Sequence, residues 1–283
     1  MIGVVVCTRN RAARLDRCLA SFSSSDGDYE LVVVDNGSED ATKSVVARHS
    51  GRLPLAYVFE PRPGLSNARN SGIAQLQHPL IAFTDDDCLV ADGWLSSIAA
   101  TFDAHPDVAI VGGRVEAASE NEASVSTRTH DAFERIATAE RVLSLMSGCN
   151  MTFRREVFAR IGTFDPVFGK GRPIGSAEDL DIMYRALRAG LSIVYAPDVV
   201  VSHAHGRDNA EAIAAVARDY VRGRGAFYCK FIADRHIARM AYWETLALLR
   251  QSLRDANARA MLRGLAAGAL HQVNAMRAAH RAR

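Results

Sequence analysis

The sequence predicts an α/β protein with a mostly parallel central sheet flanked by helices, followed by a C-terminal helical extension. Through the first half of the chain, short apolar runs alternate with segments of helical spacing, a pattern typical of strands joined by crossover helices. The runs are continuous, as expected for strands that are buried on both faces. From Asn209 onward the pattern is almost purely helical and rich in Ala, Leu and Arg, which indicates a second kind of unit.

The expected strands of the first half are apolar runs that stop at turn residues or at polar clusters. They are Ile2–Cys7, Leu31–Val34, Leu55–Phe59, Leu80–Thr84 and Val108–Gly112. A helix is expected over Arg14–Phe22, where apolar residues recur at helical spacing, and another from about Asp92 to Phe102. Between residues 60 and 72, prolines and glycines exclude regular structure until about Asn67.

The alternation breaks beyond Gly113. Two helices and two strands are expected there, followed by His203: Ala132–Met146, Ser176–Ala189 with Gly190 as its C-cap, Ser192–Tyr195 and Val199–Ser202. The loop Thr163–Gly175 is rich in glycine and carries basic residues, which favours a mobile lid, although a plain surface loop has the same composition.

Size and composition fit one large domain, or one domain with an appendage, of 283 residues. The five cysteines are scattered and lack any CxxC pair, which argues against a disulfide framework or a zinc site and favours a reducing compartment. The N-terminus lacks the features of a signal peptide. No stretch approaches the roughly 20 apolar residues of a membrane-spanning helix. The expected location is therefore the cytoplasm.

The net charge of +2 hides an asymmetry along the chain. Residues 207–283 carry 14 basic and 6 acidic groups, whereas the preceding residues carry 20 and 26. This predicts an acidic body over residues 1–205 and a basic helical extension over residues 206–283. The extension either packs on the body or presents a basic amphipathic surface to anionic lipid, giving peripheral membrane contact. No nucleic-acid partner is expected, because the basic residues form no recognisable module.

Three adjacent carboxylates, Asp85, Asp86 and Asp87, follow the strand at Leu80–Thr84. Like charges this close repel by roughly 1 kcal/mol per pair in water and about 4 kcal/mol at an intermediate dielectric. Either water solvates such a cluster or a divalent cation such as Mg²⁺ or Mn²⁺ neutralises it. An acidic loop that caps the next helix is the competing interpretation.

Other polar groups follow predicted strands in the same way. In open parallel sheets, ligands bind in the crevice beyond the carboxyl ends of the strands. Each group has a structural alternative: a helix cap, an Asx-turn or a surface histidine. Their coincidence at one sheet edge favours a binding site. The groups are Thr8, Arg9 and Asn10 after the first strand, Asp35 after the second, and His203 after the last.

A further acidic pair, Glu178 and Asp179, opens the helix predicted from Ser176. Acidic residues in a first helical turn stabilise the helix through its dipole and through capping. A carboxylate at a helix start that faces a cleft is equally well placed to act as a general base. Position in the sequence does not separate the two interpretations.

Together these segments resemble the family 2 glycosyltransferases, which are inverting enzymes of the Rossmann-like GT-A fold. The resemblance covers about residues 1–205, with a nucleotide-sugar half over about 1–115 and an acceptor half over about 116–205. It rests on five ordered segments: VVVCTRNR, LVVVDNGSEDAT, GLSNARNSGI, FTDDDC with its D-x-D motif, and GCNMTFRREVFARIGTFDPVFG followed by SAEDLDIMYRALRAG.

The resemblance implies a role for each candidate residue. Asp87 would ligate a divalent cation, Mn²⁺ or Mg²⁺, His203 would be a further metal or diphosphate ligand, and Asp179 would be the general base with Glu178 beside it. Asp85 would contact ribose or the metal. The other expected binding residues are Thr8, Arg9, Asn10, Asp35, Arg69, Asn70 and Asp86 on the nucleotide side, and Gly148, Cys149 and Asn150 on the sugar and acceptor side.

The implied function is metal-assisted single displacement from a nucleotide-diphosphate sugar, a UDP-sugar by preference, to a saccharide, lipid-linked or small-molecule acceptor. A metal neutralises the leaving diphosphate, and a base takes the proton of the acceptor hydroxyl. Two alternatives stay open: a sugar-nucleotide pyrophosphorylase, and a nucleotide-sugar-binding protein without turnover. The residues 7–11 contain no glycine, unlike the phosphate loop usual in pyrophosphorylases.

Overall fold

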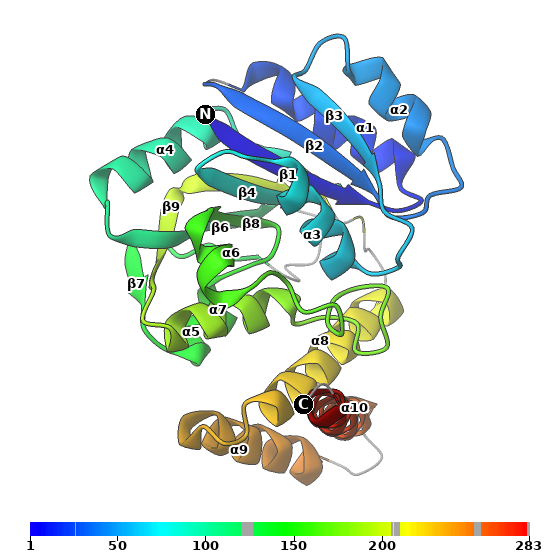
Figure 1. Ribbon diagram of the computed structural model, residues 1–283, viewed down its shortest axis with the longest axis vertical. Helices are drawn as coiled ribbons and strands as arrows, with labels where there is room; N and C mark the ends of the chain where they lie inside the picture. The colour runs from blue at the N-terminus through cyan, green and yellow to red at the C-terminus, as the bar shows by residue number, and fades with distance from the viewer. Residues whose placement is uncertain (26, 120–126, 205, 207–209, 252–255, 282–283) are drawn as a thin grey trace.

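A nine-stranded mixed sheet forms the centre of the computed structural model, which describes residues 1–283 except 26, 120–126, 205, 207–209, 252–255 and 282–283 (Figure 1). The strands are β1 Ile2–Thr8, β2 Tyr29–Asp35, β3 Leu55–Phe59, β4 Leu80–Asp85, β5 Cys88–Val90, β6 Val108–Ala117, β7 Glu134–Ile136, β8 Asn150–Arg154 and β9 Ser192–His203. The helices are α1 Ala12–Ser21, α2 Thr42–His49, α3 Leu65–Gln75, α4 Trp94–Ala104, α5 Ala139–Leu145, α6 Glu156–Ile161, α7 Glu178–Arg188, α8 Ala210–Lys230, α9 Arg235–Gln251 and α10 Ala256–Arg281.

The strand order is β3-β2-β1-β4-β8-β6-β9-β5, and β7 pairs with the outer side of β9. The strands β1 to β4 are mutually parallel, whereas β8 runs antiparallel between β4 and β6. The register pairs Thr8 with Asp35 and Cys7 with Asp85. The polar residues that follow these three strands therefore come to one edge of the sheet, as the sequence predicts.

Two hydrophobic cores lie on opposite faces of the sheet. Successive side chains of a strand point to opposite faces, so Val4 and Val6 pack with α1, α2 and α4, while Val5 and Cys7 pack with α3 and the later helices. Because both faces of these strands are buried, their sequences are continuous apolar runs.

The structure corrects several predicted elements. The helix expected over Ala132–Met146 is instead β7 followed by α5, because Ile136 pairs with Ile193 at the sheet edge and Thr138 caps α5 by accepting from Arg141 N–H. The two closing strands are one strand, β9, with a register shift opposite Gly113. The helix α3 begins at Leu65, earlier than expected, since the carbonyl of Lys170 satisfies the Leu65 N–H.

The helices α8 to α10 form a bundle below the sheet (Figure 1). The rings of Phe227 on α8 and of Phe231, just after it, pack on Tyr184 of α7, at centroid distances of 5.3 and 4.9 Å. The boundary predicted between residues 205 and 206 falls beside residues 205 and 207–209, which are outside the described part of the chain. Among the described residues, no helix combines the length and apolarity needed to cross a membrane.

Candidate active site

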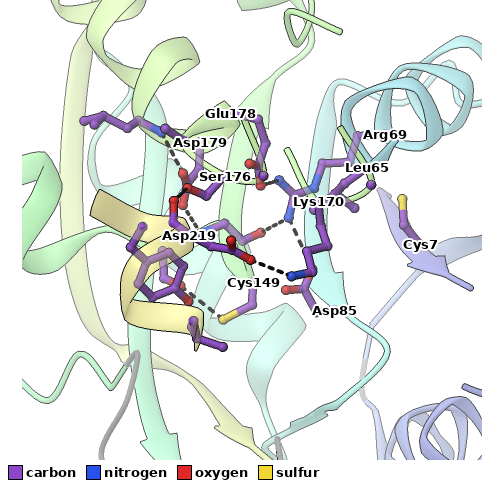
Figure 2. Close-up of a pocket in the computed structure, with 18 of the residues that line it drawn as sticks. Cys7, Leu65, Arg69, Asp85, Cys149, Lys170, Ser176, Glu178, Asp179 and Asp219 are labelled. Atoms are coloured by element: carbon purple, nitrogen blue, oxygen red, sulfur yellow. Dashed lines mark hydrogen bonds and ion pairs between the residues drawn. The ribbon is translucent and has the colours of Figure 1, made fainter. Parts of the chain in front are cut away.

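A cavity of about 500 Å³ opens at the carboxyl edge of the sheet. Its walls come from the ends of β1 and β4, from α3, and from the segments that carry Gly148, Glu178 and Asp179. The helix α8 closes the side that faces α7 (Figure 2). The cavity thus brings together residues that are far apart in the sequence.

The carboxylates Asp86 and Asp87 lie beneath the start of α1. Thr8 Oγ1 donates a 2.7 Å hydrogen bond to Asp86, and Arg11 Nη1 lies 2.9 Å from Asp86 and 3.1 Å from Asp87. Arg14 adds a 3.5 Å contact to Asp87. Burial raises the pKa of Asp86 to about 6, although Arg11 opposes the shift. The repulsion expected in the triplet is therefore offset by two arginines, Arg11 and Arg14.

The donor atoms of Asp87, Cys88 and His203 all lie within 4.8 Å of one another, and all three residues are buried. Cys88 and His203 face each other because β5 pairs with β9 in that register. Burial opposes ionisation of Asp87, but the 3.2 Å contact with His203 and the nearby arginines hold its pKa well below the usual range. Burial also opposes the charge on His203, yet Asp87 and its acidic neighbours raise its pKa to about 9.

This donor set fits a divalent cation that replaces the proton between His203 and Asp87, because a metal binds neutral imidazole. A carboxylate oxygen and an imidazole nitrogen suit Mn²⁺, and a thiol suits softer cations. Asp85 lies outside the cluster, because its Oδ1 pairs with Arg69 at 3.2 Å. Of the predicted metal ligands, Asp87 and His203 are thus together, with Cys88 beside them, while Asp85 faces Arg69.

Arg69 lies at the back of the cavity, between Asp85 and Glu178 (Figure 2). Its guanidinium donates to Glu178 Oε1 at 2.8 Å and to the Gly148 carbonyl at 3.0 Å. Burial and the adjacent Asp179 raise the pKa of Glu178 to about 7, against the opposing charge of Arg69. The pair links α3 to the first turn of α7.

Asp179 faces Gly148 across the cavity. Its Oδ2 accepts a 2.9 Å hydrogen bond from the Gly148 N–H, and its Oδ1 accepts from the Leu180 N–H at 2.8 Å. A Cβ on Gly148 would lie 3.0 Å from Arg69 and 3.1 Å from Asp179, so the glycine keeps the space between these groups open. Ser176, where the sequence predicts the helix to begin, lies before α7, and its Oγ donates to the Asp219 carbonyl at 2.8 Å.

The backbone is strained at the residue that precedes α7. Ala177, the residue before the helix, has φ +73°, a left-handed conformation that a non-glycine residue rarely adopts. Such strain concentrates at functional sites, where the surrounding contacts hold it. Here it aims Glu178 and Asp179 into the cavity.

The predicted binding residues divide into two sets. Thr8, Arg9, Arg69, Asp85, Asp86, Gly148 and Cys149 line the cavity. Asn10, Asp35, Asn70 and Asn150 are not among its lining residues. Asn70 exchanges two hydrogen bonds with the Phe164 backbone, and Asn150 accepts from Trp94 and donates to two carbonyls. Asp35 accepts from Tyr57 Oη and from Ser38 N–H, both at 2.8 Å.

Sequence reasoning missed three groups of residues. Arg11 and Arg14 contact the carboxylates, and their spacing at the start of a helix was the available signal. Cys88 directly follows the carboxylate triplet, but its role depends on pairing with a distant strand. Four α8 residues line the cavity, and no local pattern links them to it: Val216, Asp219, Tyr220 and Arg224.

Solved structures of sugar transferases share the fold. The mannosyltransferase PcManGT from Pyrobaculum calidifontis, in complex with GDP-Man and Mn²⁺, superposes with a TM-score of 0.65 at 22% identity, covering 99% of this chain and 79% of that one. TarS 1-349 from S. aureus, in complex with UDP-GlcNAc, gives a TM-score of 0.59 at 20% identity, over 79% and 66% of the two chains. The predicted GT-A fold is confirmed by this likeness.

Curated relatives carry glycosyltransferase names. The glycosyltransferase AglE of Haloferax volcanii is 29% identical over 71% of this chain, and the match spans 66% of its length. The pre-mycofactocin glycosyltransferase of Mycobacterium tuberculosis is 27% identical over 80% of this chain and 46% of its own length. This chain therefore spans less than two thirds of either relative.

The family model described as Glycosyl transferase family 2 matches residues 3–162, more than half of the chain. The matched segment includes β1, the carboxylate triplet and Gly148, and it ends before α7. By this match the chain belongs to Glycosyl transferase family 2.

Proposed function

We propose that this protein is an inverting glycosyltransferase that moves a sugar from a nucleotide-diphosphate donor to an acceptor hydroxyl. One observation carries the proposal: a single cavity holds a cluster able to bind a divalent cation and, across Gly148, a carboxylate aimed into the open space. These are the two groups that single displacement needs, one for the leaving diphosphate and one for the nucleophile.

Asp87 and His203 would hold a divalent cation, Mn²⁺ or Mg²⁺, with Cys88 beside them. A cation bound there supplies Lewis-acid neutralisation of the charge that develops on the diphosphate. Asp85 would contact the ribose or the metal-bound water, within reach of Arg69. Arg9, exposed at the end of β1 and without an ion-pair partner among the described residues, is placed to meet a donor phosphate.

The nucleotide would bind at the carboxyl edge of the sheet. Thr8, Arg9, Asn10 and Asp86 surround the end of β1, and Asp35 would accept a hydrogen bond from the base of a UDP-sugar. Asn70 and Asn150 support this site by holding Phe164 and Trp94 in place, since their amides bond to those residues. Gly148 and Cys149 would lie along the sugar.

Asp179 would take the proton of the acceptor hydroxyl as that oxygen attacks the anomeric carbon. Its Oδ2 accepts one hydrogen bond, from Gly148 N–H, which orients the carboxylate and leaves room for the acceptor. A single in-line attack breaks the bond to the diphosphate and inverts the anomeric centre, so the enzyme needs no covalent intermediate. Glu178, paired with Arg69, would contact the sugar or the acceptor.

Release of nucleotide from a panel of UDP-, GDP- and dTDP-sugars, with Mn²⁺ or Mg²⁺ and with candidate saccharides, tests the proposal. We expect release that EDTA abolishes, that Asp87→Ala reduces at least a hundredfold, and that Asp103→Ala leaves unchanged, because Asp103 is an exposed carboxylate on α4. Full activity in EDTA would show that transfer does not require a divalent cation. Pyrophosphate-dependent formation of a nucleoside triphosphate would indicate a pyrophosphorylase, and donor binding without release would indicate a binding protein.

Peripheral membrane contact through the C-terminal helices is part of the proposal. On α9, Tyr242 and Trp243 are 60% and 57% exposed. Arg235, Arg239 and Arg250 lie at helical spacing with them, exposed and without ion-pair partners among the described residues. Aromatic rings with arginines on one helix face suit the surface of an anionic bilayer. The five free cysteines support a reducing compartment such as the cytoplasm.

Co-sedimentation with phosphatidylcholine vesicles, with and without phosphatidylglycerol, tests this contact. We expect binding only to the anionic vesicles, weakened by salt and lost in the double variant Tyr242→Ala, Trp243→Ala. Phe59→Ala is the control, because it removes an equally exposed ring from β3. Equal co-sedimentation of all variants would show that the α9 surface does not bind the membrane.

A further inference from the structure

We propose that the end of the cavity beyond Asp179 binds the apolar part of a neutral, amphiphilic acceptor. The acceptor hydroxyl would lie at Asp179, and an alkyl or aryl portion would lie between α5, α7 and α8. The inference rests on the proposed transfer for the role of Asp179, and adds the chemical class of the acceptor, which the donor site does not determine.

The walls of this end are apolar on three helices. Met183 lies one turn beyond Asp179 on α7, so both side chains face the cavity. Val142, Leu143 and Met146 line it from α5 and its C-cap. Val216 and Tyr220, one turn apart on α8, also line the cavity. An apolar chamber that opens beside a catalytic carboxylate is suited to an aglycone.

The helix α8 is fixed in this position by contacts with the start of α7. Ser176 Oγ donates to the Asp219 carbonyl at 2.8 Å, and Arg222 Nε donates to the Ile174 carbonyl at 2.9 Å. A Cβ on Gly223 would lie 2.1 Å from Ser176 Oγ, so the two backbones approach as closely as glycine allows. The chamber is therefore a built part of the site.

The basic side chains around the chamber already have hydrogen-bond or ion-pair partners. Arg128 donates to the carbonyls of Thr127, Leu143 and Met146, at 2.8 to 3.3 Å. Arg224 pairs with Glu244, and Lys170 pairs with Asp219 at 2.7 Å (Figure 2). A phosphorylated acceptor would have to compete with these partners, and the carboxylates of Asp179 and Asp219, which also line the cavity, would repel it. Charge thus favours a neutral acceptor at this end of the cavity.

Direct binding of paired ligands tests the inference without requiring turnover. Calorimetry would compare methyl and octyl glycosides of glucose, galactose and mannose, below the critical micelle concentration. Each fully buried methylene is worth roughly fourfold in affinity. We expect at least one octyl glycoside to bind at least tenfold more tightly than its methyl partner, and more tightly than the same octyl glycoside carrying a 6-phosphate.

Two variants of α8 locate the binding. Val216→Asp puts a charge into the apolar wall and should reduce the octyl preference to threefold or less. Ala215→Asp adds the same charge at the neighbouring, exposed position, outside the lining residues, and should keep the preference. Val216→Ala, which shortens the wall without adding charge, should give an intermediate value if Val216→Asp does not fold.

The outcomes separate this inference from the proposed function. Four results would each overturn the apolar acceptor site. They are equal affinity for methyl and octyl glycosides, no measurable binding of any octyl glycoside, tighter binding of the octyl glycoside 6-phosphate than of the unphosphorylated one, and an unchanged octyl preference in Val216→Asp. Nucleotide release in the donor panel is measured independently. Release without a chain-length preference refutes only the acceptor class, and a chain-length preference without release refutes only the transfer.

Discussion

The guanidinium of Arg69 on α3 donates a 2.8 Å hydrogen bond to Glu178 on α7, and the side chains are only 2% and 9% exposed. This ion pair joins the half of the chain that carries the carboxylate triplet to the half that carries Asp179. Buried ion pairs add little net stability relative to apolar residues, but loss of one partner is costly because a charge stays buried alone. The pair therefore sets the relative position of the two halves of the site.

Arg69→Met should lower the free energy of unfolding by about 3–5 kcal/mol at pH 8, because Glu178 loses its ion-pair partner and must either stay buried as a lone carboxylate or take up a proton. Glu178→Gln should cost less, because Arg69 keeps Asp85 and the Gly148 carbonyl as partners. Urea denaturation measures both values. Arg135→Met, which breaks an exposed pair with Asp107, is the control and should change little. A larger loss in the control than in Arg69→Met would contradict the role of the buried pair.

The raised pKa of Glu178, about 7, predicts a pH dependence of stability. Between the unfolded value near 4.5 and the folded value near 7, the folded state keeps a proton that the unfolded state has released. Stability from this group is therefore lost as pH rises through that window, by on the order of 3 kcal/mol, and is constant above it. The difference in unfolding free energy between wild type and Glu178→Gln, measured from pH 4.5 to 8, isolates the effect. A difference that does not change with pH would disprove it.

Asp179→Asn keeps the shape of the side chain and removes the proton acceptor. If Asp179 is the general base, transfer should fall by roughly 10²–10⁴-fold while donor binding survives. If it serves only α7, through the Leu180 N–H, the cost should be about 1 kcal/mol of stability and little activity. Thermal midpoint, UDP affinity and transfer rate distinguish the two roles. Near-normal transfer would make Glu178 the next candidate.

Gly223→Ala should destabilise the protein by about 1–3 kcal/mol, because the new methyl group overlaps Ser176. The displacement of α8 should also weaken acceptor binding more than donor binding, since α8 forms part of the proposed acceptor site. Gly51→Ala is the matched control, because no atom lies within 4 Å of the added carbon there. Chemical denaturation and separate KM values for donor and acceptor give the readout. Equal behaviour of the two variants would show that α8 does not need this close approach.

The parallel half of the sheet could be predicted because its signals are local. Continuous apolar runs mark β1, β2, β3 and β4, and parallel strands in register bring their carboxyl ends to one edge. The same reasoning placed Thr8, the carboxylate triplet and His203 near one another. It could not assign Cys88, whose neighbour His203 is more than a hundred residues away and is brought there by the pairing of β5 with β9.

Less of the structure of the second half of the chain could be predicted from its sequence. Residues 132–146 have helical composition, yet Ile136 pairs with β9. That pairing is stabilised by a strand distant in the sequence, which local periodicity does not reveal. The lid predicted over Thr163–Gly175 stays a prediction. In the structure the loop is held near its start by the contact of Phe164 with Asn70 and in its middle by that of Lys170 with Asp219.

The sequence by itself determined the alternating fold, the sheet edge at which the site lies and the chemistry of its carboxylates, because each depends on residue type and short-range spacing. Only the tertiary structure decided which of those groups meet. It paired Arg69 with Glu178 and brought Val216 and Tyr220 to the same cavity as Met183. These contacts join residues tens to more than a hundred positions apart, and their geometry is set by how helices pack on the sheet and on one another, which no local pattern encodes.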